Sequence, residues 1–288
     1  MTAFSDRSRS PGAAVALAAL LLATATASLA NDSVLYSLRA ATLQAFDRYV
    51  AATEASQSAT LQASHFLWIE ALPNRECTTA YAKLKSGEVE MQRVRPGDSS
   101  RGGAVPSGMI HHWKGLVFVP GASLDDVLRV LQDYDHHSTI YAPDVERSRI
   151  ESRDGDHFRV FLRFRRRRVV TVVLDTEHDV HYYRDSPTRA HSRSSATRIA
   201  EVDHPGTPDE KEKNPGEDSG FLWRMETWWR MEQNDGGVYI QSEVVSLTRD
   251  IPAGLGWLIE PFVTSIPKES LQFTLNATRK AVVVKLKK

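Results

Sequence analysis

Residues 221–252 read FLWRMETWWRMEQNDGGVYIQSEVVSLTRDIP, and this stretch decides the fold. Two runs of strand-forming residues, Phe221–Glu232 and Val238–Arg249, flank the turn sequence Asn-Asp-Gly-Gly at 234–237, so the stretch predicts an antiparallel hairpin. After Pro252 the pattern becomes mostly helical to the C-terminus. A strand pair that leads into a long terminal helix predicts a sheet with that helix across one face.

Between residue 108 and this hairpin, five more strands and one short helix are expected. The strands are predicted at Ile110–Val119, Val145–Glu151, His157–Arg167, Val169–Tyr183 and Ala190–Val202. Between the first two, Ser123 is a candidate N-cap, and Asp125 and Asp126 suit the first turn of a helix because its N-terminus carries partial positive charge. The sequence therefore predicts an α+β fold in which a curved antiparallel sheet grips a long C-terminal α-helix.

Several short motifs lie within this order of elements. They are Trp113-Lys114-Gly115, Val119-Pro120-Gly121, Leu131-Gln132-Asp133-Tyr134, Arg249-Asp250-Ile251-Pro252, Ile266–Leu271 and Ala277–Ala281. With them, residues 108–284 resemble the START-like, helix-grip (SRPBCC) superfamily of lipid-transfer domains, polyketide cyclases and coenzyme Q-binding proteins. The resemblance implies a START-like domain over 108–288, with a cavity for a hydrophobic ligand between its sheet and its terminal helix.

The N-terminal third of the chain lies outside the resemblance. Residues 1–30 have two arginines, an Ala/Leu-rich run and small residues before Ala30, which is typical of a signal peptide and predicts an exported, periplasmic or secreted protein. An uncleaved membrane anchor is the alternative. Residues 31–107 are expected to form a helix over Ser33–Glu54, extended segments at His65–Leu72 and Tyr81–Val94, and a linker that together extend the sheet domain.

The overall composition excludes several classes of protein. The 288 residues are 41% hydrophobic and 25% charged, with 36 basic and 36 acidic side chains, which is ordinary globular composition. A net charge of +0 argues against nucleic acid as a partner, because phosphate binding needs a basic surplus. The single cysteine, Cys77, excludes an internal disulfide. No metal-ligand spacing or nucleophile motif is present in the sequence, so we expect no metal, no cofactor and no catalytic residue.

The first strand of the quoted hairpin carries the candidate ligand-binding face. Period-two alternation places Trp223, Met225, Thr227, Trp229 and Met231 together, and a Trp/Met surface suits an irregular hydrophobic ligand. The predicted ligand-binding set is Trp223, Met225, Trp229, Met231, Gln241, Glu243, Trp257 and Phe262. A dry core is the alternative for the apolar members, and a solvent-facing strand is the alternative for Gln241 and Glu243.

Five arginines within six positions form the strongest local charge cluster of the sequence. They are Arg163, Arg165, Arg166, Arg167 and Arg168. They are candidates for contact with anionic lipid headgroups at a membrane surface or with an acidic partner. The alternative is an edge strand whose charge prevents aggregation, paired with Asp175, Glu177 or Asp179 on the next strand or with the acidic loop at 209–218.

Together these features predict an exported, non-enzymatic START-like protein that binds a hydrophobic small molecule, lipid or quinone. One alternative is an enzyme of the cyclase or hydrolase type, with Glu243 or a histidine as general base. Another is an interaction or scaffold protein that uses the arginines of 163–168. The sequence leaves the oligomeric state open.

Overall fold

A single antiparallel sheet organises the part of the chain that the computed structural model describes. The described residues are 40–62, 65–95, 105–167, 171–214, 217–249 and 256–287, with side chains of the last segment described from residue 265. The strands are β1 (Glu90–Arg93), β2 (Gly108–Pro120), β3 (Val145–Asp154), β4 (His157–Arg167), β5 (Thr171–Ser186), β6 (Arg189–Asp203), β7 (Lys211–Glu212), β8 (Arg224–Asn234) and β9 (Gly237–Arg249). Their order is β1-β2-β9-β8-β6-β5-β4-β3, with β7 paired to β6.

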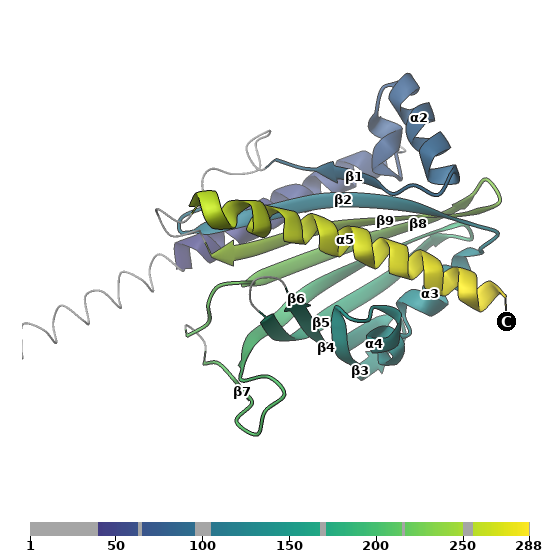
Figure 1. The fold of residues 1–288 in the computed structure, drawn as a ribbon. Helices are drawn as coiled ribbons and strands as arrows, with labels where there is room; N and C mark the ends of the chain where they lie inside the picture. The colour runs from purple at the N-terminus through teal and green to yellow at the C-terminus, as the bar shows by residue number, and fades with distance from the viewer. Residues whose placement is uncertain are drawn as a thin grey trace, which may run out of the picture.

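A long C-terminal helix lies across one face of this sheet, which we call the inner face (Figure 1). The helical elements are a helix over residues 40–62, η1 (Trp68–Ala71), α2 (Asn74–Lys85), α3 (Leu124–Leu131), η2 (Tyr134–His136), α4 (His137–Ile140) and α5 (Gly256–Leu286). The predicted α+β fold, in which an antiparallel sheet grips a long C-terminal helix, is confirmed by this arrangement of sheet and α5. Among the described residues, no helix has the length and apolar character of a membrane span.

The inner face carries the main core. Val117 and Val119 of β2, Met231 of β8 and Ile240 of β9 pack there with α3 and α5. α5 contributes Leu271, Leu275 and Val282 to this cluster. Register shifts in the β3–β4 and β5–β6 pairs bend the sheet, because a β-bulge adds local twist.

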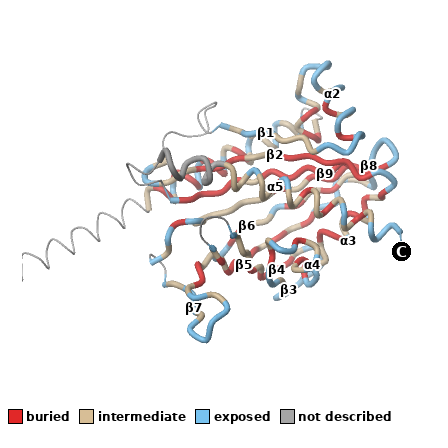
Figure 2. The backbone as a smooth tube through the Cα atoms, in the orientation of Figure 1, coloured by how far each residue is buried: buried red, intermediate tan, exposed pale blue. Residues whose placement is uncertain are grey.

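The opposite face of β2, β8 and β9, which we call the outer face, is covered by the N-terminal segment. Phe46 and Tyr49 of the 40–62 helix pack on Val245 and Leu247, while η1 and α2 cover the next part of β2 and β9. Figure 2 shows the result: β2 and β9 are buried along most of their length, and the buried residues of β8 lie within Trp228–Glu232. The described part of the N-terminal segment therefore packs on the sheet.

Two predictions in this segment are wrong. Tyr81–Val94 is predicted to be an extended segment, but α2 continues to Lys85 and only Glu90–Arg93 forms a strand. His65–Leu72 was expected to be extended and contains the 3-10 turn η1. The two buried residues of α2, Ala80 and Leu84, are four positions apart, as on one side of a helix. Most other residues of this segment are polar, so this helical spacing of apolar residues does not stand out in the sequence. The predicted signal peptide, and residues 96–104 of the linker, lie outside the described residues.

Candidate functional site

A row of side chains crosses the inner face beneath α5. Antiparallel register sets Tyr182 of β5 beside Ser192 of β6, Ser192 beside Trp229 of β8, and Trp229 beside Ser242 of β9. Ser242 in turn pairs with Gly115 of β2. Directly paired residues project to the same side of a sheet, so these side chains share the face that α5 covers.

Two hydroxyl groups in this row are buried without a hydrogen-bond partner. Ser192 is 1% exposed and Ser242 is 0% exposed, and among the described residues neither Oγ atom has a partner. An unpaired hydroxyl in an apolar setting costs about 1–3 kcal/mol, which makes such groups rare in native proteins. Trp229 stands between them, so an apolar ring is flanked by two hydroxyls, each of which can donate one hydrogen bond and accept up to two.

Two other polar side chains of the inner face, His178 and Tyr182, are paired within the protein. His178 Nε2 lies 2.9 Å from Thr176 Oγ1, and burial lowers the pKa of His178 to about 4. Tyr182 shares a 2.8 Å hydrogen bond with Tyr134, and its hydroxyl also donates to the carbonyl of Leu131. His178 is therefore neutral at physiological pH, and the inner face combines an apolar surface with neutral hydrogen-bonding groups.

The predicted alternation of β8 is confirmed for its central residues. Trp229 and Met231 pack with the α5 cluster, while Trp228 lies on the outer face against the helix over 40–62. Trp223 differs from the prediction: it precedes β8, packs with the outer-face cluster and donates its ring N–H to Asp218 at 2.6 Å. The alternation fails there because Trp223 lies outside the regular strand.

A small hollow of about 80 Å³ adjoins Trp223, Phe221 and Leu174. It is smaller than the pockets of several hundred Å³ that hold typical small-molecule ligands. Trp257 and Phe262 belong to α5, and their side chains lie outside the described residues.

Gln241 and Glu243 do not lie on the face that α5 covers, which corrects their predicted place. Both project to the outer face and are buried by the N-terminal segment, with 2% exposure each. Gln241 accepts a 2.8 Å hydrogen bond from the Trp68 backbone. The strand pattern is compatible with a ligand cavity and with open solvent, but the structure shows a third setting in which the N-terminal segment covers the strand.

Glu243 is the centre of a buried polar cluster. His112 Nε2 lies 2.7 Å from its carboxylate and Lys114 Nζ lies 3.4 Å away. The other ring nitrogen of His112 lies 2.7 Å from the Tyr49 hydroxyl, which links the cluster to the helix over 40–62. Arg230 donates to the Phe66 carbonyl nearby. These contacts fix the N-terminal segment to the sheet.

The pKa of Glu243 reflects two opposing effects. Burial raises it, but the hydrogen bond from His112 and the charges of Lys114, His112 and Arg230 outweigh burial and leave the pKa below its ordinary value. A carboxylate with a lowered pKa is a weak proton acceptor at neutral pH. This environment suits a structural anion better than the general base considered from the sequence.

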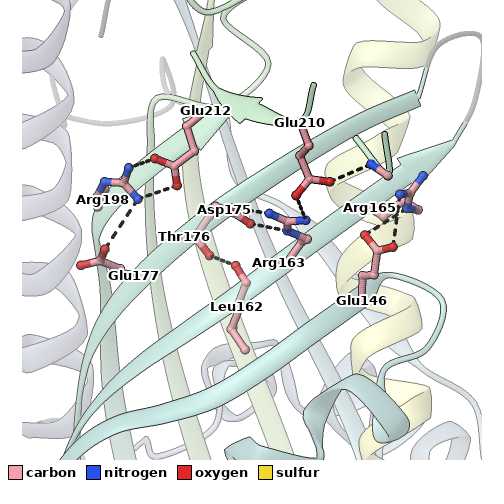
Figure 3. A network of polar contacts seen from close by, with 11 residues as sticks. Glu146, Leu162, Arg163, Arg165, Asp175, Thr176, Glu177, Arg198, Glu210 and Glu212 are labelled. Atoms are coloured by element: carbon pink, nitrogen blue, oxygen red, sulfur yellow. Dashed lines mark hydrogen bonds and ion pairs between the residues drawn. The ribbon is translucent and has the colours of Figure 1, made fainter. Parts of the chain in front are cut away.

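Three arginines of the cluster, Arg163, Arg165 and Arg166, form ion pairs within the chain, and Figure 3 shows those of Arg163 and Arg165. Arg163 is 6% exposed and binds Asp175 through two hydrogen bonds of 2.6 and 2.7 Å, with Glu210 at 2.7 Å on a third nitrogen. The hydrogen bond with Asp175 raises the pKa of Arg163. Both partners belong to the groups named in the edge-strand alternative: the next strand and the acidic loop.

The remaining arginines differ in how they are used. Arg165 binds Glu146 at 3.1 and 3.2 Å, and Arg166 binds Asp144 at 2.8 Å. Arg167 is exposed at the end of β4, and Arg168 lies outside the described residues. Arg163 therefore has no donor directed to an external anion, and its place in an anionic-contact surface is corrected by its burial against two carboxylates.

Sequence reasoning missed Ser192 and Ser242. Serine is common in strands and loops, and nothing in the local pattern distinguishes these two from the other serines of β6 and β9. Their role depends on the pairing of β6, β8 and β9, which brings together residues 50 positions apart. The period-two alternation of β8 marked only Trp229, the residue between them.

No protein-family model matches this chain, and no curated protein matches it. Similar solved structures include a STAR-related lipid transfer protein fragment from Xanthomonas axonopodis, at 18% identity over 66% of this chain and 98% of that chain, with a TM-score of 0.41. The Zhui aromatase/cyclase from Streptomyces sp. R1128 is similar at 16% identity over 62% and 96%, TM-score 0.41. Human STARD10 is similar at 10% identity over 75% and 84%, TM-score 0.41. The ligands and activities in these names are properties of those proteins.

Proposed function

We propose that this protein binds a hydrophobic small molecule, lipid or quinone between the inner face of its sheet and α5, without transforming it chemically. The observation that carries the proposal is the pair of buried, unpartnered hydroxyls on Ser192 and Ser242 with Trp229 between them. A ligand with one polar end would bond to these hydroxyls while its apolar part contacts Trp229 and Met231.

The physical basis of this binding is burial of apolar area, at about 25 cal/mol per Å². Met231 and Trp229 offer deformable and flat apolar surfaces, and hydroxyl partners orient the polar end of the ligand. Satisfying a buried hydroxyl adds to affinity because the free protein carries the cost of leaving it unpaired. Recognition of this kind favours an amphipathic molecule over a pure hydrocarbon.

The test uses the chain from residue 31 onward, extracted with organic solvent and examined by mass spectrometry for bound molecules. A fluorescent fatty acid then serves as the probe for the wild type and for the double variant Ser192→Ala, Ser242→Ala. We expect the variant to bind roughly thirtyfold more weakly, since each of the two lost hydrogen bonds is worth about 1 kcal/mol and about 1.4 kcal/mol is a factor of ten.

Ser195→Ala is the matched control, because Ser195 is also on β6 but bonds to Glu226 instead. Equal probe affinity for the wild type and the double variant would contradict the proposed site. Recovery of a chemically altered probe would contradict the non-enzymatic part of the proposal.

We also propose that the protein is exported. The support is the basic, apolar and small-residue order of residues 1–30. Expression of the full chain followed by cell fractionation and N-terminal sequencing tests this, with Asn31 expected as the new terminus. A full-length chain retained in the cytoplasm would contradict export, and a full-length chain in the membrane fraction would favour the anchor.

A further inference from the structure

Two histidines and one aspartate converge on the outer face of the sheet, away from the proposed ligand site. His157 begins β4 and pairs directly with His181 of β5, and Asp179 stands two residues before His181. The residues that alternate with them, Phe158, Val180 and Tyr182, belong to the inner core. The three side chains therefore project to the side opposite α5.

The donor atoms of this group lie close together. His157 Nε2 is 2.8 Å from Asp179 Oδ2, and His181 Nε2 is 3.0 Å from Asp179 Oδ1. The two imidazole rings stack with centroids 3.9 Å apart. One ligand atom from each residue lies within 4.8 Å of the others. Ligands held about 2.0–2.2 Å from one ion are themselves roughly 3 Å apart, and the two histidine–aspartate distances are close to this spacing.

We propose that His157, Asp179 and His181 form a binding site for a divalent late first-row transition metal ion such as Zn²⁺. Two imidazole nitrogens and one carboxylate are a ligand set that this class of ion takes, whereas Ca²⁺ and Mg²⁺ prefer oxygen ligands alone. The ion would occupy the place of the two hydrogen bonds that now join the rings to Asp179. Coordination positions not filled by the protein would be taken by water.

The surroundings allow an ion to enter and charge to be balanced. The side chains of His157, Asp179 and His181 are 37%, 36% and 43% exposed, so the site is reached from solvent. One carboxylate offsets part of the charge of the ion. Arg159, the cross-strand neighbour of Asp179, is an exposed cation that would weaken binding, so Arg159→Gln is expected to strengthen it.

The test is calorimetric titration of Zn²⁺ into an untagged chain from residue 31 onward, together with the nitrogen hyperfine pattern of bound Cu²⁺. We expect one ion per chain with two nitrogen ligands, and a loss of roughly tenfold or more in Zn²⁺ affinity for His157→Ala and for His181→Ala. Asp179→Asn keeps a hydrogen-bonding oxygen but loses the charge, so it is expected to weaken binding while the fold is retained.

His136→Ala is the matched control, because His136 also contacts one aspartate, Asp133, but among the described residues it belongs to no group of three metal-ligating side chains. Unchanged Zn²⁺ affinity in both His157→Ala and His181→Ala, with the wild-type circular dichroism spectrum, would overturn the proposal. Absence of Zn²⁺ binding by the wild type would do the same. Neither result would bear on the ligand site of the inner face, which shares no residue with this group.

Discussion

Glu243 illustrates how the setting of one residue decides its role. The strand pattern places it beside Gln241 in an alternating run, which is equally compatible with a cavity wall and with a solvent face. The structure surrounds it with His112, Lys114 and Arg230 beneath a second layer of chain. Its carboxylate is thereby a buried counter-ion, and its removal leaves positive charge without a partner.

We predict that Glu243→Gln lowers the free energy of unfolding by about 3 kcal/mol at pH 7, because one partner of a buried ion pair is lost. The lowered pKa of Glu243 means that this stabilisation is present above the pKa of the unfolded chain and is lost as pH falls through the lower folded value. Urea unfolding at several pH values measures both effects. Glu151→Gln, at an exposed pair with Arg149, is the control, and an equal loss in both variants would contradict the prediction.

At the scale of elements, two contacts define how helices meet the sheet. The helix over 40–62 inserts Phe46 and Tyr49 into the outer face, and α5 reaches the inner face closely at Gly115. A Cβ at Gly115 would overlap Leu275 and lie 2.8 Å from Met91 Sδ. The absence of a side chain is thus what allows α5 to pack against β2.

We predict that Phe46→Ala destabilises the protein by about 3–5 kcal/mol, because Phe46 is 1% exposed and its removal leaves a cavity under the N-terminal helix. Leu61→Ala on the same helix is the control, since Leu61 is 40% exposed. Urea unfolding at pH 7 compares the two. Similar, small effects would show that the helix is not docked in solution.

We predict that Gly115→Ala costs about 1–3 kcal/mol through overpacking against α5. Leu275→Ala removes the overlapping atom, so the cost of Gly115→Ala should be smaller in that background than in the wild type. A double-mutant cycle by urea unfolding measures this coupling. Strictly additive effects would contradict the close approach of α5.

At the scale of the whole molecule, three histidines are held neutral by burial. Burial lowers the pKa values of His111, His137 and His178 to about 4 each. They lie on three different elements of the fold: β2, α4 and β5. In the unfolded chain each would titrate near its ordinary pKa of about 6.5.

We predict that stability falls as pH decreases from about 6.5 to about 4, because the unfolded chain takes up protons that the folded chain does not. Each such histidine contributes up to about 1.4 kcal/mol per pH unit within that window. Urea unfolding between pH 7 and pH 5 measures the slope, and His178→Gln should reduce it by one such increment. A flat profile in the wild type would contradict the prediction.

The sequence by itself determined the features that depend on local pattern. Three such features each depend on a few neighbouring residues. They are the turn at 234–237, the projection of Trp228 and Trp229 to opposite faces, and the capping of α3 by Ser123. The order of strands and helices followed from those local patterns, and it was sufficient to indicate the helix-grip fold. The local pattern did not predict α2, because only two of its residues, Ala80 and Leu84, are buried.

Only the tertiary structure decided what depends on strand pairing and on coverage by distant segments. Ser192 and Ser242 lie on either side of Trp229 because β8 pairs with both β6 and β9. His157 meets Asp179 and His181 through the β4–β5 register, and Glu243 is buried because residues 40–95 fold back over its strand. These groups are distant in sequence, so no local period marks them, and their chemistry is set by the neighbours that folding brings into contact.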